Sequence, residues 1–447
     1  MLSGISAQVS PLQVDTLKET KIPDQWDLQS CIDYAKEQNI TIRKNRITAA
    51  STQIDVKTAK AALFPSLSFS TGHQVVNRPY QETSSRVSGS EIISSNSKTS
   101  YNGNYGLNAS WTLYNGNKRL KTIQQEKLNN QMAELDVATS ENNIQESIAQ
   151  VYIQILYAAE SVKVNENTLQ VSIAQRDRGQ ELLNAGSIAK SDLAQLEAQV
   201  STDRYQLVTA QATLEDYKLQ LKQLLELDGE NEMNIYLPAL SDENVLAPLP
   251  TKRDVYISAL SLRPEIEASK LNVEASELGI NIAKSSYFPT ISLSAGIGTN
   301  HTSGSDFTFG EQVKNGWNNS IGLSISVPIF NNRQTKSAVQ KAKLQYETSM
   351  LSLLDEQKAL YKTIESLWLD ANSTQQRYAA ANEKLKSTQI SYELISEQFN
   401  LGMKNTIELL TEKNNLLQAQ QEQLQAKYMA ILNTQLLKFY QGDQLAL

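Results

Sequence analysis

Apolar residues recur every seven positions along several stretches of this chain. Three series keep that spacing: Ile148, Ile155, Val162 and Leu169; Leu193, Val200, Leu207, Leu214 and Leu221; Leu410, Leu417, Leu424 and Ile431. A seven-residue repeat places one apolar seam along a helix, and such seams pack side by side with knobs-into-holes geometry. The pattern predicts long helices packed along their lengths, and from the helices alone a plain coiled-coil rod remains an alternative.

The lack of helix breakers predicts how long these helices are. Four stretches contain neither Gly nor Pro: 117–178, 187–228, 331–401 and 403–441. The first would form a helix about 93 Å long at about 1.5 Å per residue. A helix over about 27–62 is expected before it, with a counterpart over about 252–286 in which Pro264 marks a helix start.

Four short segments alternate between apolar and small polar residues, the pattern of strands with two unlike faces. Their apolar positions are Leu67, Phe69 and Thr71; Tyr105, Leu107, Ala109, Trp111 and Leu113; Ile291, Leu293, Ala295 and Ile297; and Ile321, Leu323, Ile325, Val327 and Ile329. The apolar face could meet another sheet in a soluble sandwich. It could equally meet lipid, with the small polar face toward water.

Several features near the strands favour the membrane alternative. Aromatic residues stand at the helix-proximal strand ends, where an interfacial girdle would lie: Phe64, Tyr114, Tyr287 and Phe330. The Ser-, Asn- and Gly-rich segments 76–100 and 300–318 are expected as long outer loops, with His73 and His301 as solvated residues beside or within them. Four strands cannot close a barrel, and open sheet edges cannot lie in lipid, so the chain must associate to complete its sheet. Two copies would supply eight strands and three would supply twelve, and twelve suit a wide, water-filled channel whose small inward residues do not plug it.

The chain is an internal duplication. Residues 64–72 recur at 288–296, the Tyr105–Ser110 segment recurs at 321–326, and the Gly186 turn recurs at Gly402. The pattern divides the chain into an N-terminal extension (1–26), a first repeat (27–237), a connector (238–251), a second repeat (252–440) and a C-terminal tail (441–447). Each repeat is expected to run helix, strand, loop, strand, very long helix, Gly turn and long helix.

Composition excludes several classes of function. A net charge of -7 argues against nucleic acid as a partner. The single cysteine, Cys31, cannot form an intrachain disulfide and fits a small apolar position on a helix. No phosphate-binding loop or Cys/His metal spacing occurs, so we expect no enzyme, no catalytic residues, no cofactor and no metal site. No apolar run has the length of a membrane helix, and the first eight residues fit the trailing end of a removed or truncated signal peptide.

Taken in order, these features resemble the TolC-like outer-membrane efflux factor family over about Trp26 to Tyr440. The resemblance rests on Trp26-Asp27-Leu28, the paired Phe-Pro-x-[Leu/Ile]-Ser segments, Arg263-Pro264-Glu265-Ile266 and the two Gly turns. It implies an α+β membrane protein whose trimer forms a 12-stranded β-barrel in outer-membrane lipid, continued by a periplasmic barrel of 12 helices. It also implies the function: an export duct of an efflux or type I secretion system, working with a periplasmic adaptor (membrane fusion) protein and an inner-membrane pump of the RND, ABC or MFS type.

The resemblance also assigns roles at the helix tips. The turns, with Ala185, Gly186, Leu401 and Gly402, would dock the adaptor. In the segment 399–411, Glu408 stands at the family's first pore-lining Asp and Thr411 at the second; Lys404 stands where Arg is typical. Phe399 replaces a Tyr that would bond the first-repeat Asp, here Asp192; Phe offers no hydroxyl, and Lys lacks the planar fork of Arg.

The resemblance leaves alternatives open. A solvated helix carboxylate is the simpler interpretation of Glu408, and a helix cap that of Asp192. For the whole chain, the rivals are a soluble periplasmic coiled-coil adaptor and a structural protein. Adaptors usually carry one helical hairpin, whereas this chain has two, and a structural rod has no need of four amphipathic strands.

Overall fold

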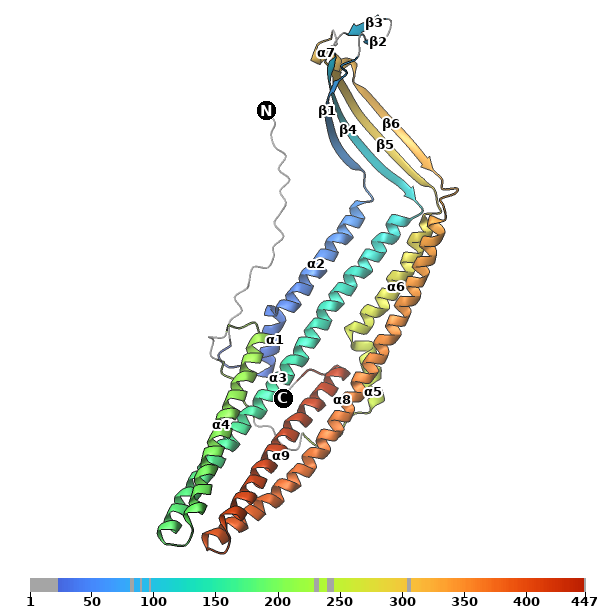
Figure 1. Ribbon diagram of the computed structural model, residues 1–447. Coiled ribbons are helices and arrows are strands. Elements are labelled where there is room, and N and C mark those ends of the chain that lie inside the picture. The colour runs from blue at the N-terminus through green and yellow to red at the C-terminus, as the bar shows by residue number, and fades with distance from the viewer. Residues whose placement is uncertain are drawn as a thin grey trace. The chain divides into compact units, whose positions relative to one another are not determined.

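The computed structural model describes residues 23–80, 84–88, 91–95, 98–228, 233–238, 245–303 and 307–445 (Figure 1). Its helices are α1 (Leu28–Gln38), α2 (Ile40–Ala61), α3 (Lys118–Asn184), α4 (Lys190–Leu224), α5 (Lys252–Leu262), α6 (Pro264–Ser285), α7 (Phe309–Asn315), α8 (Gln334–Asn400) and α9 (Thr406–Gln441). Its strands are β1 (Ser66–Asn77), β2 (Ser84–Ser88), β3 (Glu91–Ser95), β4 (Thr99–Asn115), β5 (Thr290–Thr302) and β6 (Asn318–Ser326). Most of the expected N-terminal extension and the middle of the connector lie outside the described residues.

The chain divides into two units, which are described separately. The first comprises Met1–Ile47, Glu134–Glu267 and Leu354–Leu447, and it contains the α3–α4 and α8–α9 hairpins. The second comprises Thr48–Ala133 and Ala268–Leu353, and it contains all the strands. No helix of the described residues is long and apolar enough to cross a membrane.

The long helices agree with the prediction from the missing breakers. α3 and α8 are each 67 residues long. Gly179 lies within α3 and does not end it. A Cβ on this glycine would lie 2.5 Å from Leu196 Cδ1 of α4, too close for an ordinary contact. The glycine therefore lets the two helices of the hairpin approach each other closely.

The first-repeat opening helix, expected as one element over 27–62, is two helices. They meet at Asn39, which is 4% exposed and whose Oδ1 accepts hydrogen bonds from Thr41 N (2.9 Å) and Ile42 N (3.4 Å). An Asn side chain that satisfies the first free N–H groups of a helix acts as an N-cap and fixes a helix start. In the second repeat, Pro264 begins α6, as expected.

The core of the first unit surrounds the middle of α3. The buried cluster contains Trp26, Cys31, Ile32, Ile148, Tyr152, Ile155, Leu156, Leu221, Leu225, Tyr378 and Ile431. It includes Ile148 and Ile155 of the first heptad series, Leu221 of the second and Ile431 of the third, so part of each seam packs in this core. Cys31 is fully buried and burial raises the pKa of its thiol to about 12, so it behaves as a small apolar residue.

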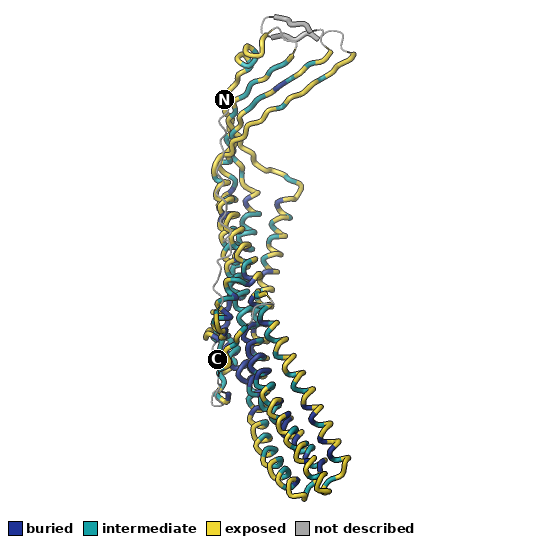
Figure 2. Tube along the Cα trace, turned by 90° about the vertical axis from the view of Figure 1, so that its left-hand side faces the viewer, coloured by how far each residue is buried: buried dark blue, intermediate teal, exposed yellow. Residues whose placement is uncertain are grey.

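The second unit is built on one antiparallel sheet of order β1-β4-β5-β6. β1 pairs with β4 (Phe69↔Leu107), and β5 pairs with both β4 (Leu107↔Ile297) and β6 (Leu293↔Leu323). Up to Trp111, this register puts the predicted apolar positions of β4 and its neighbours on one face and the alternating small polar positions on the other. The prediction is wrong at Leu113, because the register shifts between Thr112 and Tyr114 and places Tyr114 opposite Ile291. Figure 2 shows the strands mostly as exposed or intermediate.

Three expectations about the strand ends need correction. β6 ends at Ser326, before Val327 and Ile329, because Pro328 has no N–H with which to continue the ladder. The outer segments are not plain loops: 76–100 contains the β2–β3 hairpin, and 300–318 contains α7. His73 and His301 are not loop residues; they lie on β1 and β5.

Candidate functional site

The two hairpins of the first unit end in turns of the same construction (Figure 1). Gly186 and Gly402 adopt φ angles of 75° and 74°. In each turn, the residue after the glycine donates its N–H across the helix end: Ser187 to Leu182 O (2.8 Å), and Met403 to Gln398 O (2.8 Å). This is the Schellman closure, in which glycine takes the left-handed position without strain from a Cβ.

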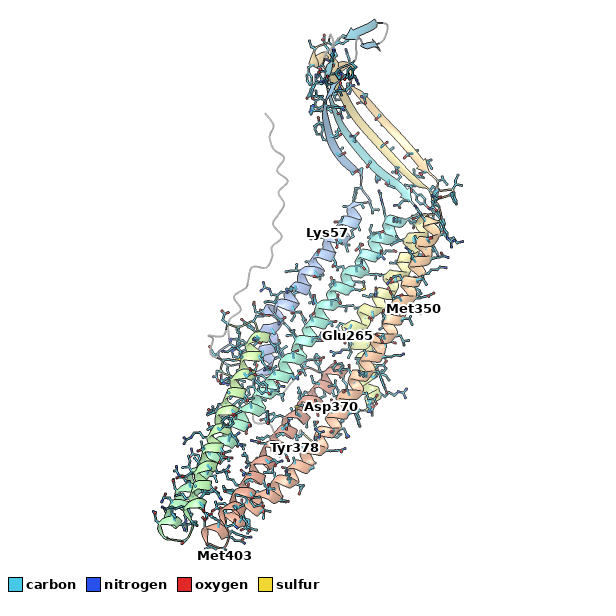
Figure 3. All side chains as sticks on the ribbon, viewed as in Figure 1. Lys57, Glu265, Met350, Asp370, Tyr378 and Met403 are labelled. Carbon is cyan, nitrogen blue, oxygen red and sulfur yellow. The ribbon has the colours of Figure 1, made fainter. Side chains whose placement is uncertain are left out.

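The tips of these turns face solvent. Ala185 and Gly186 are exposed, as are Leu401 (75%) and Met403 (70%), which is labelled at its hairpin tip in Figure 3. A Cβ added to Gly186 or Gly402 would meet nothing within 4 Å. The expected docking residues therefore form exposed surface on both hairpins.

The second helix of the second hairpin begins with a charged cap. Asn405 Oδ1 accepts from Glu408 N (2.9 Å), and Glu408 Oε2 accepts from Asn405 N (3.2 Å). Lys404 Nζ lies 2.6 Å from Glu408 Oε1. The hydrogen bond from Lys404, then that from Asn405 N, lowers the pKa of Glu408, so this carboxylate stays ionised at neutral pH.

The other proposed gate residues make separate contacts within one chain. Asp192 Oδ2 accepts from Ala189 N (3.1 Å) at the start of α4, which is the cap role left open as its alternative. Phe399 is buried, with 3% of its surface exposed. Thr411 is exposed, and its hydroxyl bonds back to Ile407 O (2.8 Å) of its own helix. Only Lys404 and Glu408 are brought together.

A buried ion pair joins the two hairpins deeper in the bundle. Lys413 of α9 is paired with Asp203 of α4, and its ammonium also donates to the Ser172 hydroxyl of α3, which bonds the same carboxylate. The side chains of Lys413 and Asp203 are 4% and 1% exposed. Burial lowers the pKa of Lys413, against the opposing charge and hydrogen bond of Asp203.

Polar contacts around this pair extend the connection between the hairpins. Gln199 Nε2 donates to Asp203 Oδ1 (2.9 Å) and to Asn414 Oδ1 (3.3 Å). Gln175 Nε2 of α3 donates to the Tyr392 hydroxyl of α8 (2.9 Å). These contacts fix one register between the hairpins.

Sequence reasoning missed this cluster, although a signal exists. Asp203 interrupts a buried series formed by Leu196 and Val200, and Lys413 interrupts one formed by Leu409 and Leu416. A single charge within an apolar helical stripe indicates a buried partner of opposite sign.

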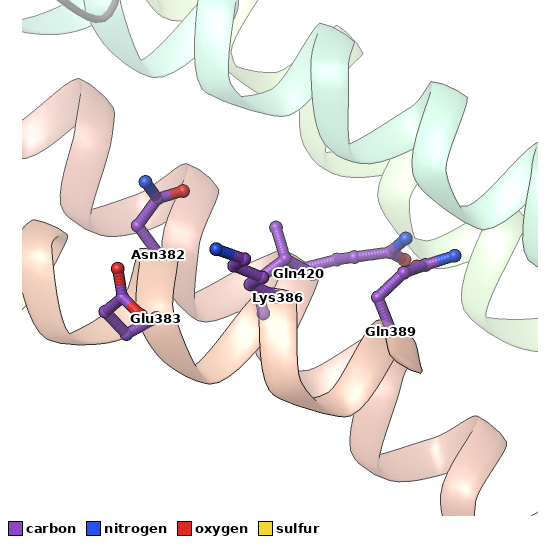
Figure 4. Close-up of a pocket in the computed structure, with 6 residues that line it drawn as sticks. Asn382, Glu383, Lys386, Gln389 and Gln420 are labelled. Carbon is purple, nitrogen blue, oxygen red and sulfur yellow. The ribbon is translucent and has the colours of Figure 1, made fainter. Parts of the chain in front are cut away.

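An open groove of about 350 Å³ lies on the α8–α9 hairpin (Figure 4). It is lined by Asn382, Glu383, Leu385, Lys386, Gln389 and Gln420. The lining is polar and solvated. Among the described residues, no group of three or more His, Cys, Asp or Glu side chains is placed to share a metal ion.

Comparison with known proteins gives a consistent result. A sequence model described as outer membrane efflux protein matches residues 31–226 and 255–442. The chain is 24% identical over 294 residues to the outer membrane efflux protein BepC of Brucella suis biovar 1, covering 65% of this chain and 61% of BepC. It is 24% identical over 294 residues to the outer membrane protein TolC of Escherichia coli, covering 64% of this chain and 58% of TolC. The match thus spans about three fifths of these relatives.

The fold is also similar to that of a solved structure. A crystal structure of CusC superposes with a TM-score of 0.78 at 18% identity, covering 95% of this chain and 96% of that one. At this identity the likeness concerns the fold alone.

Proposed function

The chain belongs to the outer membrane efflux protein family, and from that premise we propose that it is an exit duct in a bacterial outer membrane. Small molecules or proteins would leave through it from the periplasm or an inner-membrane pump. The observation that carries the proposal is the sheet. Its apolar face is strongly exposed, with Leu67 at 70%, Phe69 at 67% and Ile321 at 84%. An exposed apolar face of this extent favours lipid as its neighbour. We assign the protein no catalytic step.

We propose further that the working unit is a homotrimer. In the described sheet, β1 and β6 are the edge strands, and each has one edge whose N–H and C=O groups face no neighbouring strand and need partners in lipid. Three copies joined β6 to β1 would close twelve strands into a barrel lined by small polar residues.

The helices adjacent to these edge strands in the sequence, α2 before β1 and α8 after β6, support the same assembly. α2 exposes Ile47 (64%) and Ile54 (42%), and α8 exposes Leu344 (62%) and Leu351 (66%). In each helix the two residues are seven positions apart, which is the spacing of a seam that seeks another helix. α8 of one copy would pack on α2 of the next.

We infer the protein partners from the exposed turns at the ends of the two hairpins. The exposed turns at Ala185–Gly186 and Leu401–Gly402 would contact a periplasmic adaptor, which would link the trimer to an inner-membrane pump of the RND, ABC or MFS type. The wide Ser-, Asn- and Gly-rich face offers little chemistry for selecting cargo, so selection would lie with the pump.

The gate would lie near the same tips. Three copies of Glu408, ionised and each paired with its own Lys404, would surround the axis, with Asp192, Phe399 and Thr411 nearby. Like charges brought close repel, so a ring of carboxylates attracts cations. Because Lys404 neutralises part of this charge, the ring would be only weakly cation-selective.

The experiment is purification without a soluble fusion partner, followed by light scattering with detergent subtraction and single-channel recording. The proposal expects a detergent-requiring trimer that conducts ions. A monodisperse monomer that is soluble in buffer would exclude it and favour the soluble adaptor or structural protein.

A further inference from the structure

The only two histidines of the chain meet on one face of the sheet. His73 of β1 and His301 of β5 both lie opposite Gly103 of β4, one from each side. The two residues are 228 positions apart in the sequence numbering, and only the strand order β1-β4-β5 brings them together. They share the apolar face with Leu107, away from the small-residue face of the sheet.

The side chains converge on a point above Gly103. A Cβ built on this glycine would lie 3.2 Å from His73 Nδ1, 3.4 Å from His301 Nδ1 and 3.3 Å from the Tyr105 hydroxyl. Any other residue would fill that point with its own side chain. The glycine thus leaves a space that two imidazole nitrogens and one phenol oxygen surround.

The His73 ring is held in one orientation. The Tyr101 hydroxyl lies 2.6 Å from Nδ1, the Thr71 hydroxyl lies 3.2 Å from Nε2, and the Tyr101 ring stacks on the imidazole. These contacts suit the tautomer in which Nε2–H donates to the Thr71 hydroxyl and the Nδ1 lone pair accepts from the Tyr101 hydroxyl. When the Tyr101 hydroxyl turns away, Nδ1 offers this lone pair while Thr71 still holds the opposite ring nitrogen, which is the usual preparation of a metal-binding histidine.

The His301 ring is held by its aromatic neighbours, and its Nδ1 has no polar partner among the described residues. Tyr101 and Phe309 pack edge-on against it, with ring centroids 5.5 Å and 5.1 Å away. Phe309 belongs to α7, which is tied to β5 through Thr302 N and Gln312 Oε1 (2.9 Å). His301 Nδ1 is buried and neither accepts nor donates a hydrogen bond within the described part of the chain. A buried polar atom without a partner indicates a missing ligand.

We propose that His73 and His301 bind one divalent transition-metal ion above Gly103, through their two Nδ1 atoms, the ion taking the place of the Tyr101 hydroxyl on His73 Nδ1. The Tyr105 hydroxyl would be a third ligand. Water would complete the coordination, because the site lies near the strand ends that are distant from α2, α3 and α6, where the apolar face reaches the edge of the lipid. Imidazole nitrogens favour Cu²⁺, Ni²⁺ and Zn²⁺ over Mg²⁺ and Ca²⁺, which prefer oxygen ligands, and Cu²⁺ binds nitrogen sites most strongly. The ion would connect β1 to β5 across β4 and clamp the end of the sheet next to α7.

The assignment requires only the sheet and does not depend on channel activity. The test is therefore direct binding of Cu²⁺ to detergent-solubilised, chelator-treated protein without a histidine tag. Such a preparation contains no imidazole besides His73 and His301. Calorimetry gives the affinity and stoichiometry, and electron paramagnetic resonance counts the coordinated nitrogens.

The expected result is one Cu²⁺ per chain, with couplings from two imidazole nitrogens. His73→Gln and His301→Gln should each leave one nitrogen and weaken binding by more than about 100-fold, beyond the 10- to 100-fold typical of losing an outer-shell partner. Thr71→Val removes only such an outer partner, so its loss should fall within that range. Gly103→Ala fills the space and should abolish the two-nitrogen signal, whereas Tyr114→Phe on the same strand should change nothing.

Two outcomes would overturn the proposal. One is wild-type binding no tighter than that of the His73→Gln/His301→Gln double variant. The other is a nitrogen coupling that persists unchanged in both single variants. Matching circular dichroism spectra across the set ensure that a lost signal reports the ligands and not a lost fold.

Discussion

The two hairpins of the first unit, α3–α4 and α8–α9, are equivalent parts of the two repeats, and they differ in the positions of their buried charged residues. Their turns are superposable in construction, with glycines of nearly equal φ and the same closing hydrogen bond. The residue of the second hairpin that is equivalent to Asp203 is the buried Ala419. The residue of the first hairpin that is equivalent to Lys413 is the exposed Glu197. The two hairpins thus share their turn backbone, whereas each carries one of the two buried charges at a position where the other hairpin has none. The Lys413–Asp203 pair, which joins the two hairpins, therefore depends on residues that the two repeats do not share.

The largest expected effect comes from removing one partner of the buried pair. Asp203→Ala would leave the Lys413 ammonium buried without its counter-charge and should lower the free energy of unfolding by about 3–5 kcal/mol. Denaturant unfolding in detergent measures this loss. Glu197→Ala, at the position equivalent to Lys413, is the matched control and should stay within about 0.5 kcal/mol of wild type.

The double variant Asp203→Leu/Lys413→Met sharpens the same comparison. Apolar residues of similar volume can replace a buried ion pair without loss, so it should recover most of the stability. Equal stabilities for Asp203→Ala and Glu197→Ala would show that the copies are not joined through this pair.

The Gly186 and Gly402 turns test the feature that the two hairpins share, which is their turn geometry. Gly186→Val and Gly402→Val should each cost about 1–2 kcal/mol, because an L-residue is strained at positive φ, and the costs should be equal since neither Cβ would meet an atom. Asn at either position should restore much of the loss. Unequal costs would mean that the two turns are not equivalent.

The same turns carry the docking proposal. The Gly186→Val/Gly402→Val double variant should assemble as a trimer but fail to export. Cross-linking reports assembly, and a transport assay in cells reports export. Export at the wild-type level would remove the turns from the docking surface.

A smaller effect is expected at the start of the second helix of each hairpin. Glu408→Gln should reduce cation selectivity and block by divalent cations in single-channel recordings, and Lys404→Gln should increase both, because Lys404 offsets the Glu408 charge. Asp192→Asn, at the equivalent position of the first hairpin, should change selectivity less. If Glu408→Gln conducts like wild type with the trimer intact, Glu408 is only a solvated helix carboxylate.

The smallest effect concerns pH. The pKa of Glu408 is lowered in the folded state, so its contribution to stability is present above its ordinary value of 4.5 and disappears as the pH falls through the folded value. The stability difference between wild type and Glu408→Gln should therefore shrink on acidification over that range. A difference that is independent of pH would show that the contacts with Lys404 and Asn405 do not depend on the charge.

Sequence periodicity was enough to predict the long helices, the four strands and the Gly turns, because each depends on residues close together in the chain. The break at Asn39 was missed since a single Asn is a helix cap only when its side chain turns back onto the backbone. The Lys413–Asp203 pair was missed because it depends on the register of two hairpins. The meeting of His73 and His301 was missed because it depends on strand order, which alternating patterns do not specify.

The strand order also has a consequence for how the chain folds. β4 lies in the first half of the sequence, but one of its two partners, β5, lies in the second half, so that Tyr105 pairs with Thr299. Contacts between residues so far apart in sequence raise the contact order and slow folding, since a long loop must close before they can form. Until the second half of the chain has arrived, β4 lacks its β5 partner and its apolar face is uncovered. A strand with an unpaired edge and an exposed apolar face is prone to aggregate. The duplication that completes the sheet thus makes its centre form late, and a holding chaperone would have to protect β4 until β5 arrives.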